Sequence, residues 1–420
     1  MVRNKKNEKG QLYGLLVDYT FMFLLVISCN SMYTVLNKTF STTSLSLVIT
    51  VIFLPISIQN IILHHNLNFS KLVTFFCYYF FWIALVLGTV KIVNNLRFFT
   101  IFVLLFPTCV LYFYARYLDG QVLLVLRRLV NTIVFFSIFS LVLWVLFSNL
   151  DLVKGTSMYS SWSGLTVTRF WWVHFNTQTE SFFGLSLIRN TGIFPEAPMF
   201  AYLLLIGVFV ELFVNNRTNI CIMFVLMITL ITTLSTTGLL FGVLAIFLKV
   251  GLKYINRINL NSWTIIVGLL IVAFFVVKLL LQQKSGSSSA RVRDDDIHAG
   301  LQAWKQNIIF GNGFSSSNVI RNHMASWRQH VGNMSSLGYT SGILTILSDG
   351  GIMLFSLYIA PLLVLFKRKS AMFLNRKLLV ALIFMLATLV VTITPYVPLT
   401  IFMLSFFYVY YFIMGCNREV

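Results

Sequence analysis

Long apolar runs, separated by short polar segments, cover almost the whole of this chain. A helix that crosses a bilayer needs about 20 mostly apolar residues, and the runs are of about that length. We therefore predict an all-α polytopic membrane protein that forms one integral membrane domain over residues 1–420. The twelve predicted transmembrane helices are 13–36, 44–63, 72–93, 98–115, 127–148, 197–215, 218–234, 237–253, 263–281, 342–366, 377–394 and 397–414.

The apolar run from 218 to 253 is too long for one span. As a single helix it would extend for about 54 Å, well beyond the ~30 Å hydrocarbon core. The sequence Ser-Thr-Thr-Gly at 235–238 lies in its middle and has the composition of a tight turn. We therefore predict two short helices that are joined at this turn.

Basic residues gather in alternate short polar segments, which predicts the orientation of the chain. The N-terminal segment and the segments near 116–128, 249–257 and 367–377 are rich in lysine and arginine. The intervening short segments hold little more than Lys38, Lys91 and Arg97. Because basic loops stay in the cytoplasm, both termini are expected to be cytoplasmic. The two long loops, about 149–196 and 282–341, then lie outside the cytoplasmic (inner) membrane.

Composition changes this picture little. Hydrophobic residues make up 58% of the chain, which is well above the globular norm of roughly 45–50%. The net charge of +19 would suit a nucleic acid, but its positions follow the membrane loops, so no nucleic-acid partner is expected. No small-residue cleavage site follows the basic N-terminus, which predicts a retained first helix. The five cysteines lack metal-ligand spacing, and we expect no metal and no cofactor.

The first outer loop is expected to be partly extended. Its stretches 164–175 and 181–188 alternate in polarity and could form a short hairpin at the membrane interface. Trp162, Trp171 and Trp172 suit the level of the lipid headgroups.

The second outer loop is expected to be helical after a flexible linker at 285–290. A first helix is predicted from Asp294, with its acidic residues in the first turn, where the helix dipole favours them. A second, amphipathic helix is predicted at 320–332, because Ile320, Met324, Trp327 and Val331 form one stripe on a helical wheel. Such a helix would lie in the membrane surface.

Arginine is the residue type that carries most of the candidate chemistry. The planar guanidinium group stays charged and suits phosphate oxygens. Each arginine could instead extend to lipid headgroups, whereas the whole set favours a site for a lipid-linked phosphate or diphosphate. The arginines on the predicted outer side are Arg169, Arg189, Arg291, Arg293, Arg321 and Arg328.

Glu196, between Pro195 and Pro198 at the start of a span, is the second candidate. It could stabilise the first turn of its helix, or it could act as a general base or orient Arg189. His323 and His330 are seven residues apart on one predicted helix face. They could carry protons or could simply be interfacial ring residues.

Three segments resemble the O-antigen ligase and polymerase superfamily, especially Wzy-type polymerases of surface polysaccharides. RNTGIFPEAPMFA from Arg189 is similar to an R-x-x-G-x-F-x-E-P element before a membrane helix. ARVRDDDIHAGLQAWKQNIIFGNGF from Ala290 resembles an arginine-led segment that ends in Gly-x-Gly. TSGILTILSDGGIMLFSLYIAPLL from Thr340 is similar to the closing helix of the family. The resemblance covers roughly residues 185–365.

This resemblance implies a GT-C-like fold and a metal-independent glycosyltransferase. Its substrate would be an oligosaccharide repeat unit on undecaprenyl diphosphate, polymerised into O-antigen, capsule or exopolysaccharide. Arg189 and Glu196 would be the catalytic residues. The lipid diphosphate would be bound by residues drawn from Arg291, Arg293, Arg321, Arg328, His323 and His330. Membrane lipid, a chain-length regulator and a flippase are the further partners that the resemblance suggests.

Two departures from the family pattern bear on the function. Ligases carry a histidine directly before the closing helix, where this chain has Thr340-Ser341. Family members often carry an arginine in the turn that is Ser235-Thr236-Thr237 here. A polymerase is therefore the principal hypothesis. The alternatives are a ligase that moves glycan to an acceptor and a flippase or transporter of lipid-linked repeat units.

Overall fold

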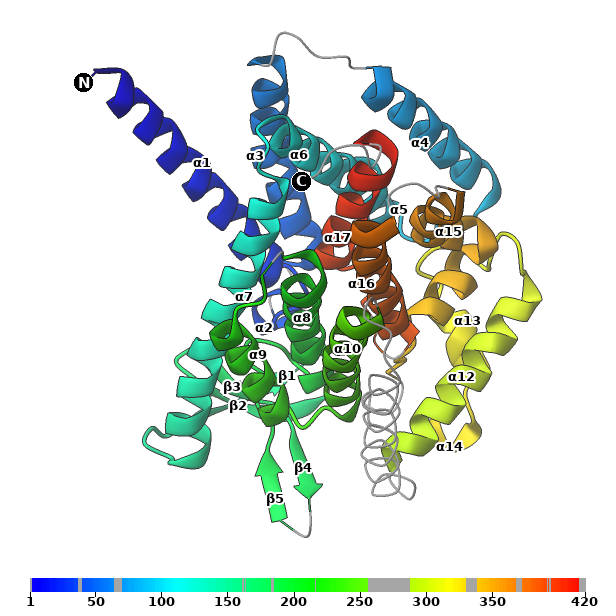
Figure 1. The fold of residues 1–420 in the computed structure, drawn as a ribbon. Helices are drawn as coiled ribbons and strands as arrows, with labels where there is room; N and C mark the ends of the chain where they lie inside the picture. The colour runs from blue at the N-terminus through cyan, green and yellow to red at the C-terminus, as the bar shows by residue number, and fades with distance from the viewer. Residues whose placement is uncertain are drawn as a thin grey trace.

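The computed structural model of the chain is predominantly helical (Figure 1). It describes residues 2–36, 40–63, 70–160, 162, 164–182, 185–215, 217–255, 288–329, 338–367, 372–390, 392 and 394–414. Within these ranges, six helices are long and apolar enough to cross a membrane, and five further apolar helices are shorter. The predicted multi-pass membrane character is thereby confirmed, whereas the count of twelve spans stays a prediction. The predicted span 263–281 lies outside the described residues.

The first half of the chain is a series of apolar helices. Three of them continue directly into a wider π-helical segment or begin with one. The bounds are α1 Val2–Ile27, α2 Met32–Leu36, α3 Thr42–Leu63, α4 Ser70–Thr89, α5 Asn95–Phe98 with η1 Phe99–Leu105 and α6 Phe106–Leu118, α7 Val122–Leu143 with η2 Trp144–Asn149, α8 Ala197–Phe209 with η3 Val210–Val214, α9 Ile220–Thr232 and α10 Thr236–Ile255.

The second half contains the helices of the second long loop and the closing helices. Their bounds are α12 Ser288–Gln306, α13 Ser317–Asn322, α14 Ser326–Gln329, α15 Gly342–Lys367, α16 Met372–Val390 and α17 Pro398–Tyr408 with η5 Val409–Ile413.

Helix α8 lies at the centre of the helical body. Its span is 94% buried, whereas the spans of α3 and α4 are 33% and 28% buried. A helix that is apolar on all sides is expected to be buried, and α8 with η3 has Glu211 as its single charged residue. The central position of α8 places its first residue, directly after Glu196, among several neighbouring elements.

The predicted break between α9 and α10 is confirmed, but it lies slightly earlier than the predicted turn at 235–238: residues 233–235 form the turn, and residues 236–238 already belong to α10. Leu234 adopts a positive φ of 50°, and the Ser235 hydroxyl accepts a hydrogen bond from the backbone N–H of Gly238. A Cβ atom on Gly238 would lie only 2.8 Å from that of Ala201, so the glycine allows α10 to approach α8 closely. The first turn of α10 therefore packs against the N-terminal part of α8.

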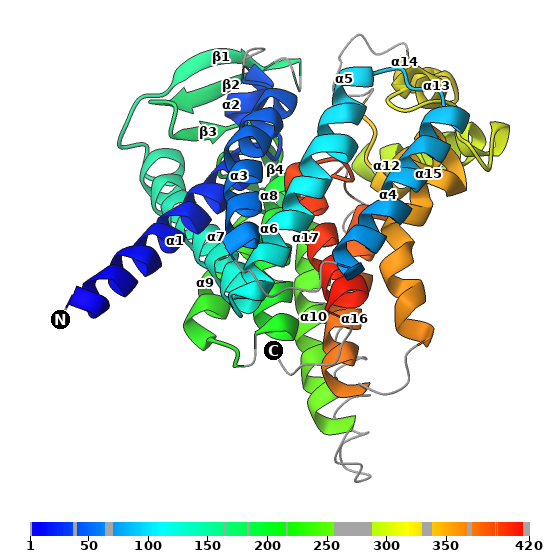
Figure 2. The same ribbon diagram turned by 90° about the horizontal axis from the view of Figure 1, so that it is seen from above.

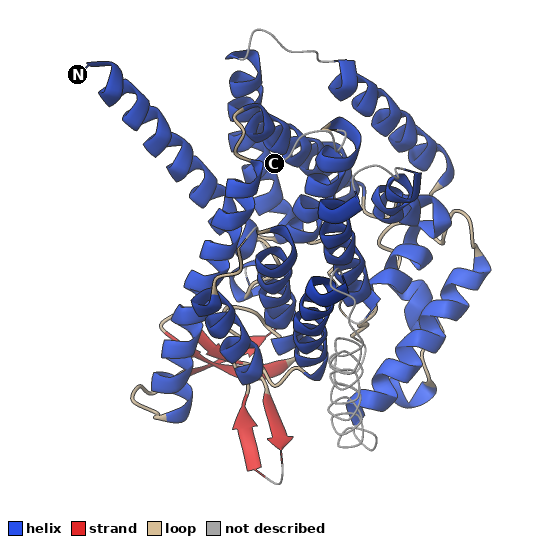
Figure 3. Cartoon of the chain, viewed as in Figure 1, coloured by secondary structure: helices blue, strands red, loops and turns tan. Residues whose placement is uncertain are grey.

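The first long loop forms two separate small sheets, which Figure 3 shows in red. Strands β1 Thr156–Ser160, β2 Leu165–Phe170 and β3 His174–Asn176 form an antiparallel sheet in the order β1-β2-β3. Strands β4 Thr179–Phe182 and β5 Leu185–Ile188 form a hairpin of their own. The two stretches that were predicted to form one hairpin do become strands, but they do not pair with each other. Strand β2 of the first stretch pairs with β1 and β3, and β5 of the second stretch pairs with β4.

The second long loop differs from its prediction in two ways. Helix α12 begins at Ser288, so Asp295 and Asp296 lie in its interior rather than in its first turn. The prediction of one amphipathic helix at 320–332 is wrong, because the structure has two short helices there, α13 and α14, with a break between them. Ile320 and Met324 are buried against α12 instead of facing a membrane surface.

Helix α15 is interrupted, and the interruption is filled by a loop. Gly351 has a non-helical backbone with a φ of 60°. The backbone N–H groups of Asn312 and Gly313 donate to the carbonyl groups of Ser348 and Asp349. The GNGF sequence therefore docks into a helix break and does more than form a turn.

Figure 2 shows how the elements are distributed along the helical body. Strands β1 and β2 and helices α13 and α14 lie at one end of the body. The beginning of α1 projects from the side of the body, away from that end. The two long loops therefore gather on the same face, which is the arrangement expected of loops on one side of a membrane.

Candidate functional site

Two arginines from the two long loops meet at the turn between α9 and α10. The Arg189 Nε donates to the carbonyl oxygen of Thr233 at 2.9 Å. The Arg293 Nη1 donates to the hydroxyl oxygen of Thr237 at 3.2 Å. Thr233 and Thr237 are four residues apart, so one turn holds both guanidinium groups. We call Arg189, Arg293 and the carboxylates of Glu180 and Glu196 around them the two-arginine site.

Glu180 on β4 contributes negative charge to both arginines. Its Oε2 lies 3.5 Å from the Arg189 Nη1. Burial lowers the pKa of Arg189 and of Arg293. The charge of Glu180 opposes this lowering at Arg189, whereas at Arg293 the charge of Asp296 and then that of Glu180 oppose it. The charge of Arg293 lowers the pKa of Arg189 further, because two like charges lie close together. Such a pair of cations favours an anionic ligand.

Glu196 is the N-cap residue of α8 and interacts electrostatically with Arg189. The indole N–H of Trp162 donates to its Oε1 at 2.7 Å. Burial raises the pKa of Glu196, whereas the hydrogen bond from Trp162 and the charge of Arg189 lower it. A carboxyl group with a raised pKa is suited to exchange a proton near neutral pH.

Helix ends add to the positive potential of this region. The Glu196 backbone precedes α8, and Thr237 lies in the first turn of α10. The N-terminal end of a helix carries a partial positive charge, which favours anions, although the first N–H group of α8, that of Ala197, is already bonded to the Gln178 side chain. Because the start of α10 packs against the N-terminal part of α8, the positive ends of both dipoles lie near the two-arginine site.

The sequence placed Arg328 among the candidate diphosphate-binding residues on the outer side, but its side chain lies inside the protein. The side chain is fully buried, and its Nη1 pairs with Asp295 at 2.9 Å and Asp296 at 2.7 Å. Its Nη2 donates to the carbonyl oxygen of Gly338 at 2.7 Å. The guanidinium group therefore fastens α14 to α12, and its hydrogen bonds are directed to the protein.

The other predicted binding residues are spread over the outer face. Arg291 is exposed and lies 6.0 Å from the ring of Trp327, and Arg321 is exposed on α13. The His323 Nε2 contacts the side-chain amide of Gln306 at 2.9 Å. Arg169 stacks 4.4 Å from the ring of Trp172. His330 lies outside the described residues.

Glu180 of the two-arginine site, and the residues Thr237 and Trp162 that contact the site, were not predicted from the sequence. Glu180 is one acidic residue in a loop, and its pairing depends on how β4 and β5 fold back. Thr237 supplies a neutral oxygen, which carries no distinctive sequence signal. Trp162 was assigned to the headgroup level, whereas its indole N–H is directed to Glu196.

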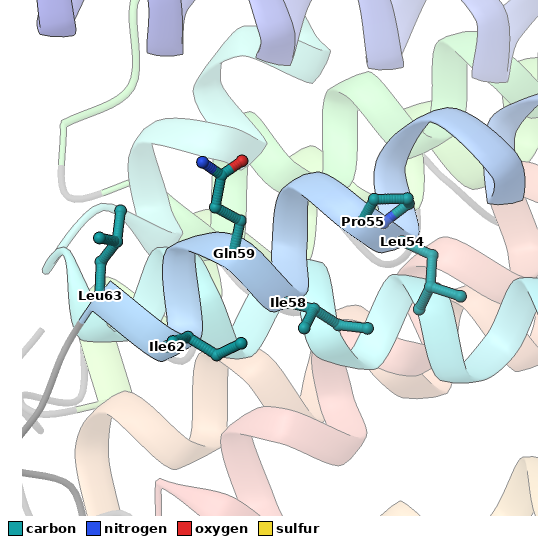
Figure 4. Close-up of a pocket in the computed structure, with 6 residues that line it drawn as sticks. All are labelled: Leu54, Pro55, Ile58, Gln59, Ile62 and Leu63. Carbon is teal, nitrogen blue, oxygen red and sulfur yellow. The ribbon is translucent and has the colours of Figure 1, made fainter.

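A shallow apolar depression lies on α3, lined by Leu54, Pro55, Ile58, Gln59, Ile62 and Leu63 (Figure 4). Its lining contains one polar side chain and no titratable group. Helix α3 packs on α6, η1 and α1, and none of these elements carries a residue of the two-arginine site. The depression therefore plays no part in the chemistry considered below.

Comparison with known proteins does not add to this geometry. No family model matches the chain, and neither the curated proteins nor the solved structures contain a match. The resemblance to the O-antigen ligase and polymerase superfamily therefore stays a prediction that rests on the quoted motifs.

Proposed function

We propose that the chain is a membrane glycosyltransferase that polymerises undecaprenyl-diphosphate-linked oligosaccharide repeat units. The observation that carries the proposal is the attachment of Arg189 and Arg293 to one turn. These residues come from motifs more than a hundred positions apart in the sequence. Two guanidinium groups beside two helix N-terminal ends match the charge of a diphosphate.

The proposed reaction uses the protein's own charged groups. A hydroxyl oxygen of one repeat unit attacks the anomeric carbon of the lipid-linked chain, and the bond between that carbon and the diphosphate oxygen breaks. Glu196 takes the hydroxyl proton. The lipid diphosphate leaves as an anion, and Arg189 and Arg293 stabilise the charge that develops on it.

The position of Glu196 supports its role as the base. Its carboxylate is oriented by the Trp162 indole N–H, and its pKa is raised by burial. Arg189 interacts electrostatically with Glu196 and also holds the proposed diphosphate position. The group that accepts the proton and the groups that stabilise the leaving anion are thereby neighbours.

A ligase is the less favoured alternative. At the place where ligases carry a histidine, the Thr340 backbone N–H and hydroxyl both donate to Asp296 Oδ2, at 3.0 and 2.5 Å. Thr340 is thus committed to a structural contact and offers no basic nitrogen.

A flippase is favoured by one observation, the interruption of α15 beside Asp349. Broken helices line the substrate sites of many transporters. Here, however, the Asp349 carboxylate accepts a hydrogen bond from the Tyr396 hydroxyl at 3.0 Å, and the loop around Gly313 fills the break. Asp18, another acid inside the helical body, is paired with Arg116 at 2.5 Å and with Arg128. Paired charges of this kind suit a static core better than a transport path.

The test is a chain-extension assay. Purified protein is incubated with a synthetic undecaprenyl-diphosphate repeat unit, and the products are separated by length. We expect a ladder of longer products that disappears in Arg189→Ala, Glu196→Ala and Arg293→Ala but persists in the exposed control Arg291→Ala. Absence of a ladder, together with transbilayer movement of the substrate, would overturn the polymerase proposal.

A further inference from the structure

Helix α8 starts without the usual contribution from its own N-cap side chain. Glu196 occupies the N-cap position with an extended backbone, but its side chain makes no capping hydrogen bond. An N-cap side chain commonly accepts from the N–H groups of the first turn, which have no partner inside the helix. The Glu196 Oε1 instead accepts a hydrogen bond from the Trp162 indole N–H at 2.7 Å. The donors of the first turn of α8 therefore need other acceptors.

The first turn of α8, all of which the structure describes, has one donor left to satisfy. Pro198 has no N–H group. The N–H groups of residues 199 and 200 donate to the Glu196 carbonyl oxygen at 3.1 and 3.4 Å. The remaining donor is the N–H group of the buried residue Ala197, and it donates to the side-chain Oε1 of Gln178 at 3.0 Å. Gln178 thus takes the place of a capping side chain.

Gln178 also contacts Arg189. It lies between β3 and β4, and its backbone carbonyl oxygen accepts a hydrogen bond from the Arg189 N–H at 3.1 Å. One residue therefore binds the backbone of Arg189 and the backbone that directly follows Glu196. This link holds the two candidate catalytic residues in one relative position.

The chemistry of the glutamine side chain suits this position. Its amide oxygen accepts a hydrogen bond but carries no net charge. A carboxylate at the same place would repel Glu196 and attract Arg189. The amide oxygen instead offsets the partial positive charge at the start of the helix without adding a charge to the two-arginine site.

From these contacts, and resting on the proposed function, we propose that Gln178 is a positioning residue that acts through Glu196. It satisfies the start of α8 in place of the Glu196 side chain, so that the carboxylate stays directed to Trp162 and available to the acceptor hydroxyl. Without the amide oxygen, the unpaired Ala197 N–H group and the positive end of the helix dipole act on Glu196 directly. Both interactions favour the ionised carboxylate, so they lower the pKa of Glu196 and make it a weaker base.

The experiment measures the protonation of Glu196 on the full chain in detergent. Infrared difference spectroscopy follows the carbonyl stretch of the protonated carboxyl group as the pH changes, and the band is assigned by its loss in Glu196→Gln. The variant Gln178→Met keeps the length of the side chain and removes its amide group. We expect the pKa of Glu196 to fall by about 0.5 pH unit, the size typical of a carboxylate beside a helix end, and the acidic limb of the pH–rate profile to move with it.

Gln178→Glu tests the same contact in the opposite direction. It keeps an oxygen that accepts from the Ala197 N–H, and it adds a second negative charge near Glu196. Because a like charge disfavours the ionised form, the pKa of Glu196 should rise. A fall of this pKa in Gln178→Glu would contradict the inference.

Thr177→Val is the matched control. Thr177 is the neighbouring half-buried residue, and its hydroxyl donates to the Thr191 hydroxyl at 3.3 Å rather than to α8. The control should leave the pKa of Glu196 unchanged. An unchanged pKa in Gln178→Met would overturn the inference, as would an equal fall in Thr177→Val. The infrared measurement needs no turnover, so a missing product ladder with a lowered pKa would reject the polymerase while the role of Gln178 stands.

Discussion

Replacing Arg328 should destabilise the fold rather than remove a ligand contact. The guanidinium group is fully buried and holds Asp295 and Asp296 on α12. Breaking a buried ion pair by removing one partner typically costs about 3–5 kcal/mol. In Arg328→Gln the carboxylates keep some partners, because Ala325 N–H still donates to Asp295 and Thr340 still donates to Asp296. We therefore expect a loss near the lower limit, about 3 kcal/mol.

The loss should also depend on pH. Burial raises the pKa of Asp296, and Arg328 is one of the groups that lower it. Without the arginine the pKa of Asp296 rises further, and protonation of the carboxyl group relieves part of the penalty. A group whose pKa is raised in the folded state loses stability as the pH rises through that pKa. The difference between variant and parent should therefore be larger at pH 8 than at pH 5.

Thermal unfolding in detergent measures this effect. A thiol-reactive dye reports unfolding through the buried Cys29 and Cys109, in a background in which Cys77, Cys221 and Cys416 are replaced by serine. The matched control is Arg291→Gln, which changes an exposed arginine and should cost less than about 0.5 kcal/mol. If Arg328→Gln unfolded at the same temperature as this control but no longer bound farnesyl diphosphate, Arg328 would be a ligand residue and the reasoning would be refuted.

Two further predictions concern the two-arginine site itself. Thr237→Val removes the hydroxyl oxygen that accepts a hydrogen bond from Arg293. Because a hydrogen bond to a charged group contributes about 1.5–3 kcal/mol, diphosphate binding measured by calorimetry should weaken about tenfold. The control Thr236→Val should show no such change. Trp162→Phe removes a hydrogen bond that lowers the pKa of Glu196, so the acidic limb of the pH–rate profile should move to higher pH. An unshifted limb would indicate that Glu196 is not the base.

The apolar helices and one critical turn could be predicted from the sequence. The length of a hydrophobic run predicts the length of a membrane helix. The division of the run 218–253 into two helices near Ser235 followed from the length of the run and from its local composition. The same turn also shows the limit of that reasoning. It lacks the arginine that the family often carries there, yet it holds two arginines from elsewhere through Thr233 and Thr237.

Contacts between distant segments could not be predicted. The sequence predicted that Arg328 lies on one amphipathic surface helix at 320–332, but its partners Asp295 and Asp296 lie more than thirty residues earlier. Once those carboxylates lie in the interior of α12, Arg328 compensates their buried charge, and the amphipathic pattern of 320–332 carries no sign of that contact. Glu180 was missed for a related reason, since only the β4–β5 hairpin brings it to Arg189.

The most direct test of the central claim is the stoichiometry of diphosphate binding. Calorimetric titration of the purified chain with farnesyl diphosphate should give one site per chain. That site should be lost in Arg189→Gln and equally in Arg293→Gln, and it should be retained in Arg291→Gln. Parent-like binding by either Arg189→Gln or Arg293→Gln, or two sites of which each variant removes one, would contradict a single site formed by both loops.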